Sequence, residues 1–165
     1  MGLHQNNKHK RIKRRRVIIN FLVLTFLVIS CKKPIQSNNE FPFENIVEKL
    51  DKVLADKQID IAKLTPFDWE QLYIFKPYTP ISVIDSKLGY IWSGAEKTFI
   101  NQEGDFHLLV FTEKNKVVNY IKWPINKGDF MRIERLKYSY DSAKFIFKKE
   151  KYGGRDKIFI YEIKL

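Results

Sequence analysis

The spacing of apolar residues changes along the chain, and each spacing predicts a different kind of element. From Phe43 to Lys57 the apolar residues recur with the period of an amphipathic α-helix. They are Ile46, Val47, Leu50, Val53 and Leu54. A second helix is predicted from Pro80 to Leu88, because proline suits the first helical turn and Gly89 can take the left-handed conformation that ends a helix.

After Gly89 the period changes to two, which predicts β-strands. The segments that show it are Phe106–Thr112, Val117–Trp123, Met131–Tyr140, Ala143–Lys149 and Lys157–Leu165. Ile59 and Ile61 predict a short strand. Trp69–Phe75 is apolar on both faces, which favours a central strand with Trp69, Tyr73 and Phe75 on one face. We expect an α+β domain in which two N-terminal helices pack on a mainly antiparallel sheet of about five to six strands.

The first 31 residues have a pattern of their own. Seven Lys/Arg lie between Lys8 and Arg16, and the apolar run Val17–Ile29 follows. A basic segment before an apolar core of roughly 7–15 residues is typical of a secretory signal peptide. As a helix, residues 17–30 would span about 21 Å, less than the roughly 30 Å of a bilayer core. The alternatives are a short uncleaved membrane helix and a basic arm for nucleic acid.

The end of this segment, Val28-Ile29-Ser30-Cys31, resembles a bacterial lipobox. The resemblance implies cleavage between Ser30 and Cys31 and a lipid on the Cys31 thiol. We therefore expect a signal peptide over residues 1–30, a lipidated cysteine and tether over 31–40, and one globular domain over 41–165. The lipid would attach the protein to the cell membrane, on the outer membrane facing the periplasm in a Gram-negative cell. A flexible tether of about nine residues reaches roughly 15–18 Å.

Processing changes how the charge is interpreted. The chain has 30 Lys+Arg and 19 Asp+Glu, a net charge of +11. Residues 1–31 hold seven of the basic residues and none of the acidic ones, so the mature chain carries +4, which argues against nucleic acid as a partner. The basic residues around the last predicted hairpin would protect an edge strand or contact anionic headgroups. They are Lys148, Lys149, Lys151, Arg155 and Lys157.

A second resemblance covers roughly residues 67–123. The block Phe67–Thr79, followed by Leu88-Gly89, is similar to a group of small uncharacterised bacterial lipoproteins with a tryptophan-acid-x-x-leucine-tyrosine pattern before a Pro-Tyr-Thr turn. This resemblance implies no activity. The capped helix and the strands after it also resemble, in topology, the small lipoprotein of the outer-membrane barrel-assembly machinery.

Catalytic chemistry has few candidates. His107 is the one histidine after cleavage and Cys31 the one cysteine, so we expect no metal site and no cofactor. His107 lies inside a predicted strand, where a packed or surface role is more common than that of a base. Asp68 and Glu70 could act as a carboxylate pair on glycans if held about 5–10 Å apart. A turn cap at Asp68 and an ion pair at Glu70 are the structural alternatives.

The aromatic residues Tyr78, Tyr90 and Trp92 lie beside turn residues, and we predict that they bind a partner. Core packing is the alternative for each. The favoured hypothesis is a non-enzymatic, lipid-anchored envelope protein that binds another envelope protein or assists assembly. Two alternatives stay open: a carboxylate-dependent hydrolase of envelope glycans, and an immunity or inhibitor lipoprotein that blocks a toxin.

Overall fold

The computed structural model describes residues 39–46, 49–50 and 58–163, which belong to the compact unit Gln36–Leu165. The strands are β1 (Asn39–Glu40), β2 (Gln58–Asp60), β3 (Gln71–Phe75), β4 (Phe106–Glu113), β5 (Lys116–Pro124), β6 (Lys137–Ser139), β7 (Lys144–Tyr152) and β8 (Arg155–Glu162). The α-helices are α3 (Ile61–Leu64) and α4 (Ile81–Leu88), and the 3-10 helices are η2 (Glu96–Thr98), η3 (Ile125–Lys127), η4 (Phe130–Arg132) and η5 (Tyr140–Ser142).

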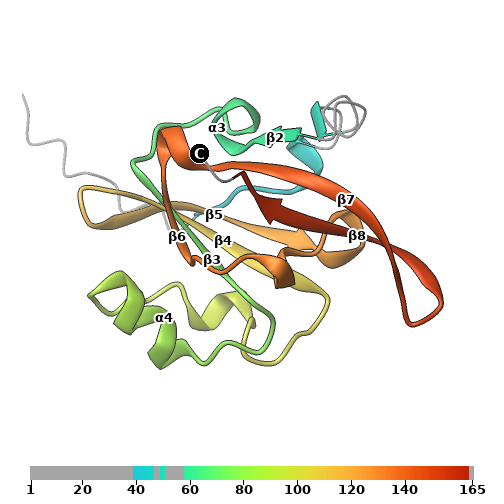
Figure 1. Ribbon diagram of the computed structural model, residues 1–165. Coiled ribbons are helices and arrows are strands. Elements are labelled where there is room, and N and C mark those ends of the chain that lie inside the picture. Colours follow the sequence, from blue (N-terminus) through green and yellow to red (C-terminus); the bar gives the residue numbers. More distant parts are fainter. Residues whose placement is uncertain (1–38, 47–48, 51–57, 164–165) are drawn as a thin grey trace, which may run out of the picture. The chain divides into compact units, whose positions relative to one another are not determined.

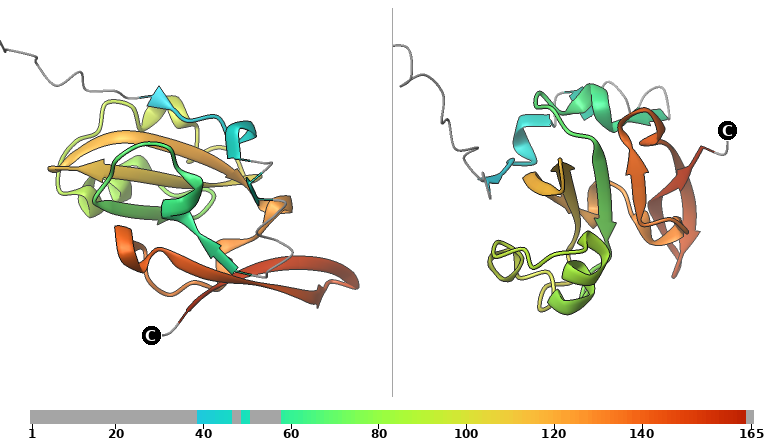
Figure 2. Two further views of the ribbon diagram at one scale, coloured as in Figure 1. Left: turned by 90° about the horizontal axis from the view of Figure 1, so that it is seen from above. Right: turned by 90° about the vertical axis from the view of Figure 1, so that its left-hand side faces the viewer.

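The strands form two sheets (Figures 1 and 2), where the sequence predicted one. The larger sheet has the order β1-β5-β4-β3-β6, and the smaller has the order β2-β7-β8. All neighbouring strands are antiparallel except β1, which pairs in parallel with β5. The side chains of Ser139 and Ser142 close η5 in a capping box, and this tight turn directs the chain from β6 into β7 of the other sheet.

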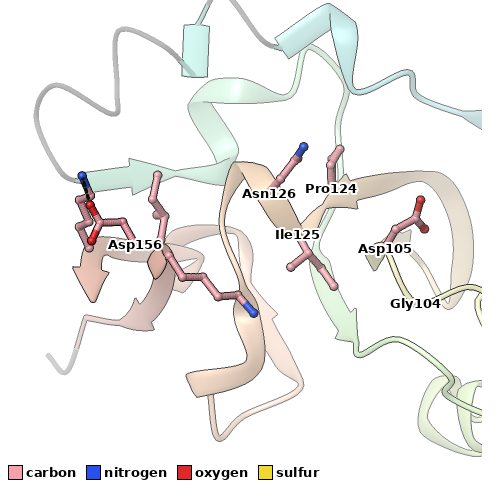
Figure 3. Close-up of a pocket in the computed structure, with 9 residues that line it drawn as sticks. Gly104, Asp105, Pro124, Ile125, Asn126 and Asp156 are labelled. Carbon is pink, nitrogen blue, oxygen red and sulfur yellow. Dashed lines mark ion pairs between the residues drawn. The ribbon is translucent and has the colours of Figure 1, made fainter. Parts of the chain in front are cut away.

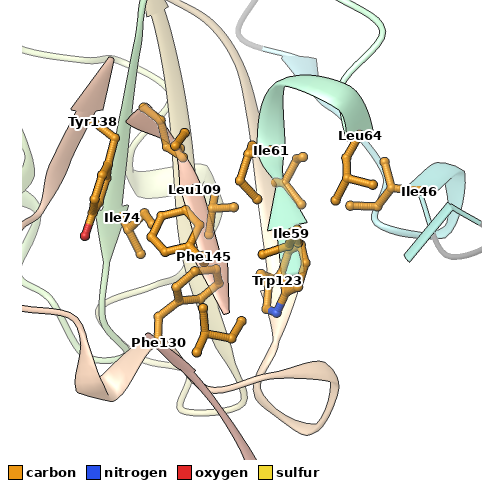
Figure 4. Packing of buried hydrophobic residues seen from close by; sticks show 14 of the residues in the cluster. Ile46, Ile59, Ile61, Leu64, Ile74, Leu109, Trp123, Phe130, Tyr138 and Phe145 are labelled. Carbon is orange, nitrogen blue, oxygen red and sulfur yellow. The ribbon is translucent and has the colours of Figure 1, made fainter. Parts of the chain in front are cut away.

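The larger hydrophobic cluster lies between the two sheets (Figure 4). Ile74, Leu109 and Trp123 of the larger sheet pack with Phe145 of β7, and all four are buried. Phe130 of η4 fills the space among them, with ring centroids 5.5 Å from both Trp123 and Phe145. Each sheet buries one face in this cluster, so apolar and polar residues alternate along β7 and β8 just as they do in the larger sheet. The predicted alternation is therefore present although the two strands belong to a separate sheet.

The other face of the larger sheet is covered by α4 and the segment that follows it (Figure 1). Tyr73 and Phe75 of β3 pack there with Ile84 and Leu88 of α4, whereas Leu72 and Ile74 point into the larger cluster. The prediction of a central strand covered on both faces is confirmed. Trp69 was assigned to the face of Tyr73, and this was wrong: it precedes β3 and packs in the larger cluster against Phe111, at 5.3 Å.

The predicted second helix is confirmed. α4 spans Ile81–Leu88, with Pro80 as its N-cap. Gly89 ends it in the left-handed conformation, at φ 84°, and its N–H donates to Asp85 O at 2.8 Å.

The predicted strand Met131–Tyr140 exists only as β6, because side-chain oxygens bind the amides before it. Asp129 Oδ1 accepts from Met131 N–H at 2.8 Å, and Glu162 Oε1 accepts from the N–H groups of Glu134 and Arg135 at 3.0 and 2.8 Å. The short strand predicted at Ile59 and Ile61 ends at Asp60, whose side chain caps α3 by accepting from Ala62 N–H at 3.1 Å.

Most of the predicted helix Phe43–Lys57 lies outside the described residues, as do the last two residues of the predicted strand Lys157–Leu165. Cys31 and residues 32–38 of the predicted tether also lie outside them. The last two residues assigned to the tether, Asn39 and Glu40, instead form β1 and pair with β5. Ile46 and Leu50 are described, and both are buried in the larger cluster.

Candidate functional site

A pocket of about 760 Å³ opens where the turn-side half of the β7–β8 hairpin meets the end of β5 (Figure 3). Its lining comes from three parts of the chain: the turn before β4, η3 with the residue before it, and the hairpin. The residues are Gly104, Asp105, Pro124, Ile125, Asn126, Lys149, Asp156, Lys157 and Ile158. Hydrophobic side chains in the middle and charged groups at the rim are the usual composition of a binding site.

Both lysines of the pocket are paired within the protein. Lys149 Nζ lies 2.8 Å from Asp156 Oδ2, and Lys151 Nζ lies 2.7 Å from Oδ1 of the same carboxylate. These ion pairs are exposed, so each contributes little to stability. Lys157 Nζ turns to the interior and lies 2.6 Å from Asp129 Oδ2. The pocket therefore presents ion-paired lysines rather than an excess of positive charge.

Asp129 connects the pocket to the core. It is 1 % exposed, and its carboxylate binds Lys157, Met131 N–H and His107 Nε2, the last at 2.8 Å. Burial alone raises the pKa of Asp129, but the hydrogen bonds from His107, Lys157 and Met131 outweigh it and lower the pKa to about 2. The backbone of Asp129 also bridges to β8, because its N–H donates to Ile158 O and its carbonyl accepts from Ile160 N–H, both at 2.9 Å.

His107 is fully buried on β4, so of the packed and surface roles that the sequence favours, the structure shows the packed one. Its Nε2 faces Asp129 Oδ1 and also lies 3.1 Å from the amide of Phe130. Nδ1 is buried without a partner among the described residues. A histidine held this way fixes η4 against β4 and is closed to substrates.

Tyr78 is the predicted partner residue that the structure exposes. Its side chain is 63 % exposed, and its backbone is left-handed at φ 62°, which is uncommon for a bulky residue. Its N–H donates to Ile100 O at 2.8 Å, which holds the turn in place. The ring lies over Gly104, where any Cβ would clash with the Tyr78 ring and hydroxyl. Tyr78 therefore adjoins the pocket through a glycine that lines it.

The other two predicted partner residues belong to the interior. Trp92 is 2 % exposed and packs against Tyr120, with ring centroids 5.5 Å apart. It does not present a surface to a partner, because the turn at Gly94 closes over its indole. Tyr90 is partly buried against the same cluster, and its hydroxyl is buried. Burial, together with the neighbouring Tyr73, raises the pKa of Tyr90 to about 12.

Asp68 and Glu70 lie far from the pocket. Both are exposed, and they lie next to the end of β4 that is away from the pocket. Residues 105–112, which connect the pocket to that end, span roughly 23 Å as an extended strand. Glu70 Oε2 accepts from Lys114 N–H at 3.0 Å, so this carboxylate supports the turn between β4 and β5.

Comparison of the chain with protein families, with curated proteins and with solved structures finds no match. Within residues 39–46, 49–50 and 58–163, no cluster of three or more His, Cys, Asp or Glu side chains could hold a metal ion. In the same part of the chain, no helix has the length and apolar character needed to span a membrane. The function must therefore be argued from the surface and its chemistry.

Proposed function

We propose that this protein is a lipid-anchored envelope protein whose globular domain binds another envelope protein through Tyr78 and the pocket beside it. The anchor would be the lipid on Cys31, left at the N-terminus after residues 1–30 are removed. On a Gram-negative cell the domain would face the periplasm from the outer membrane. The proposed role is binding, without a cofactor.

The observation that carries this proposal is the backbone at Tyr78. An L-residue in the left-handed region costs about 1–2 kcal/mol, and such strain concentrates at functional sites. Here the strain holds an aromatic ring at the surface, where it is 63 % exposed and contributes little to the core. Tyrosine offers a partner both apolar area and a hydroxyl, which makes it common at the centre of interfaces.

Residues 43–57 complete the proposed domain as a first helix on the larger sheet. Phe43, Ile46 and Leu50 support this arrangement, because all three are buried in the cluster between the sheets. The spacing of Ile46 and Leu50 is one helical turn.

The proposal is tested by site-specific crosslinking in cells. A photoreactive phenylalanine replaces Tyr78 in one strain and Tyr140 in another; Tyr140 is a matched control because it is a surface tyrosine, 44 % exposed, that packs against Trp69. We expect a protein adduct from position 78 and none of the same mass from position 140. Identical adducts from both positions, or none from position 78, would contradict the proposal.

A second variant moves Tyr78 without changing it. In Gly104→Ala the new methyl group must displace the Tyr78 ring, while the backbone at position 104 is outside the left-handed region and accepts alanine. We expect this variant to fold. A crosslinker placed at Ile91, which follows α4 and is 85 % exposed, should then lose most of its adduct with the partner protein. An unchanged yield of that adduct would argue against Tyr78 as the contact.

A further inference from the structure

One face of the β7–β8 hairpin combines aromatic rings with positive charges. The register pairs Ile146 with Tyr161, Lys148 with Phe159, Glu150 with Lys157, and Tyr152 with Arg155, so these eight residues share a face. The alternate residues Phe145, Phe147 and Ile160 point into the core. We call the first set, with the adjoining Arg132, the cationic face.

The cations of this face lie against its rings. Lys148 Nζ is 4.8 Å from the centre of the Tyr161 ring, and Arg132 Cζ is 4.8 Å from that of Phe159. Lys157 Nζ lies 5.2 Å from the rings of both Tyr152 and Phe159. Such stacking orders long side chains that would otherwise be mobile, and keeps their charges near the surface.

The hairpin also accounts for the charge of the domain. Residues 144–162 contain six Lys/Arg and three Asp/Glu, whereas residues 58–143 contain eleven of each. On the cationic face the one carboxylate, Glu150, accepts a hydrogen bond from the Tyr161 hydroxyl and lies 3.9 Å from Arg132. On the opposite face Asp156 binds both Lys149 and Lys151. Lys157 of this face is paired with the buried Asp129, so the excess of positive charge on the cationic face comes from Lys148 and Arg155.

We propose that the cationic face docks on the anionic phospholipid headgroups of the membrane to which the protein is anchored. A sheet face is a flat surface that matches a flat bilayer, and the hairpin extends beyond the larger sheet (Figure 1). Tyr152, at the turn, is 59 % exposed and flanked by Lys151 and Arg155, a composition that suits the headgroup region. This inference rests on the proposed anchor: only about seven residues, 32–38, separate Cys31 from β1, and so short a tether would keep the domain near the bilayer.

The docked state would orient the domain. Lys149, Asp156 and Ile158 line the pocket from the other face of the same hairpin, and Lys157 of the cationic face reaches it because its ammonium group turns inward to Asp129. With the cationic face on the membrane, the pocket and Tyr78 stay accessible to a second envelope protein. The anchor then fixes the distance to the membrane, and the hairpin fixes which side faces it.

The test uses the lipidated protein reconstituted in phosphatidylcholine vesicles with and without phosphatidylglycerol. Cys31 is the chain's one cysteine and its thiol would carry the lipid, so Tyr152→Cys provides a unique site for an apolar fluorescent label. We expect quenching by headgroup-linked quenchers in the anionic vesicles and little in the neutral ones. One Lys or Arg near an anionic surface changes binding about fivefold, so Lys148→Gln with Arg155→Gln should lower the docked-to-undocked ratio about 30-fold.

The matched control is Lys87→Gln with Lys97→Gln, two exposed lysines on the α4 side of the molecule. Equal quenching in both kinds of vesicle, or equal loss in both double variants, would overturn the proposal. Free polyphosphate is a competitor for the same charges. If it releases the hairpin from the vesicles at an equal concentration of negative charge, the cationic face prefers a soluble polyanion and the proposal is overturned. A chain recovered from cells without lipid would refute the anchor but not the docking. If that chain floats with anionic vesicles and not with neutral ones, docking of the cationic face is still supported. If it floats with neither, docking is refuted.

Discussion

The buried carboxylate of Asp129 makes the most quantitative prediction. It holds Lys157 of β8, His107 of β4 and the start of η4, so one side chain connects the two sheets. The substitution Asp129→Asn keeps the shape and removes the charge. We expect it to destabilise the domain in neutral solution and much less in acid.

The magnitude follows from the pKa. The pKa of Asp129 falls from an ordinary 3.8 to about 2 on folding, and one pKa unit corresponds to about 1.4 kcal/mol, which gives roughly 2 kcal/mol. Because the folded state binds this proton less tightly than the unfolded state, the contribution is fully present above pH 4 and is lost as the pH falls towards 2. The variant has no such group to titrate.

The assay is urea unfolding of both proteins at about pH 6 and about pH 2, where the difference in unfolding free energy is compared. We expect a difference of roughly 2 kcal/mol at the higher pH and well under half of that at the lower. Asp68→Asn is the control, because Asp68 is exposed, and it should change stability by less than about 0.5 kcal/mol. A difference for Asp129→Asn that does not depend on pH would refute the reasoning.

Three further predictions concern other parts of the domain. Lys114 has φ 49° in the two-residue turn after β4, so Lys114→Asn, a better residue for that turn, should stabilise by about 0.5–1 kcal/mol in thermal unfolding. Glu162→Gln should destabilise by about 1–3 kcal/mol and speed hydrogen exchange at residues 134–135, whose amides it binds; unchanged exchange there would contradict this. In urea titrations Trp92→Ala should lower the free energy of unfolding by about 3–5 kcal/mol, and Tyr78→Ala by less than about 1, because Trp92 is buried and Tyr78 is exposed. Similar losses in the two variants would contradict this prediction.

Much of the fold is predictable from residue spacing alone. The period of two located β4, β5, β7 and β8, and the signals at Pro80 and Gly89 located α4. The spacing did not predict how strands divide between sheets, because both sheets bury one face in the same core and leave the same alternating pattern. The division depends on the turn at Ser139–Ser142, and although serine favours such turns, the turn residues do not show which sheet the next strand joins.

The candidate site was only partly predictable. The turn residues beside Tyr78 and Trp92 predict that both rings are open to a partner. The structure exposes Tyr78 and buries Trp92, because turn residues do not show whether a ring points inward. Lys157 stood out only as one of the basic residues of the last hairpin. Its pairing with Asp129 gave no sequence signal, because 28 residues separate the two and only the packing of two sheets brings them together. The Gly128-Asp129 pair reads as an ordinary turn.

The most direct test of the account is the intact mass of the protein purified from the membranes of its own cells. The account predicts a chain that begins at Cys31, lacks residues 1–30 and carries the mass of a diacylglyceryl group on that cysteine. A mass equal to that of the unmodified 165-residue chain would contradict it.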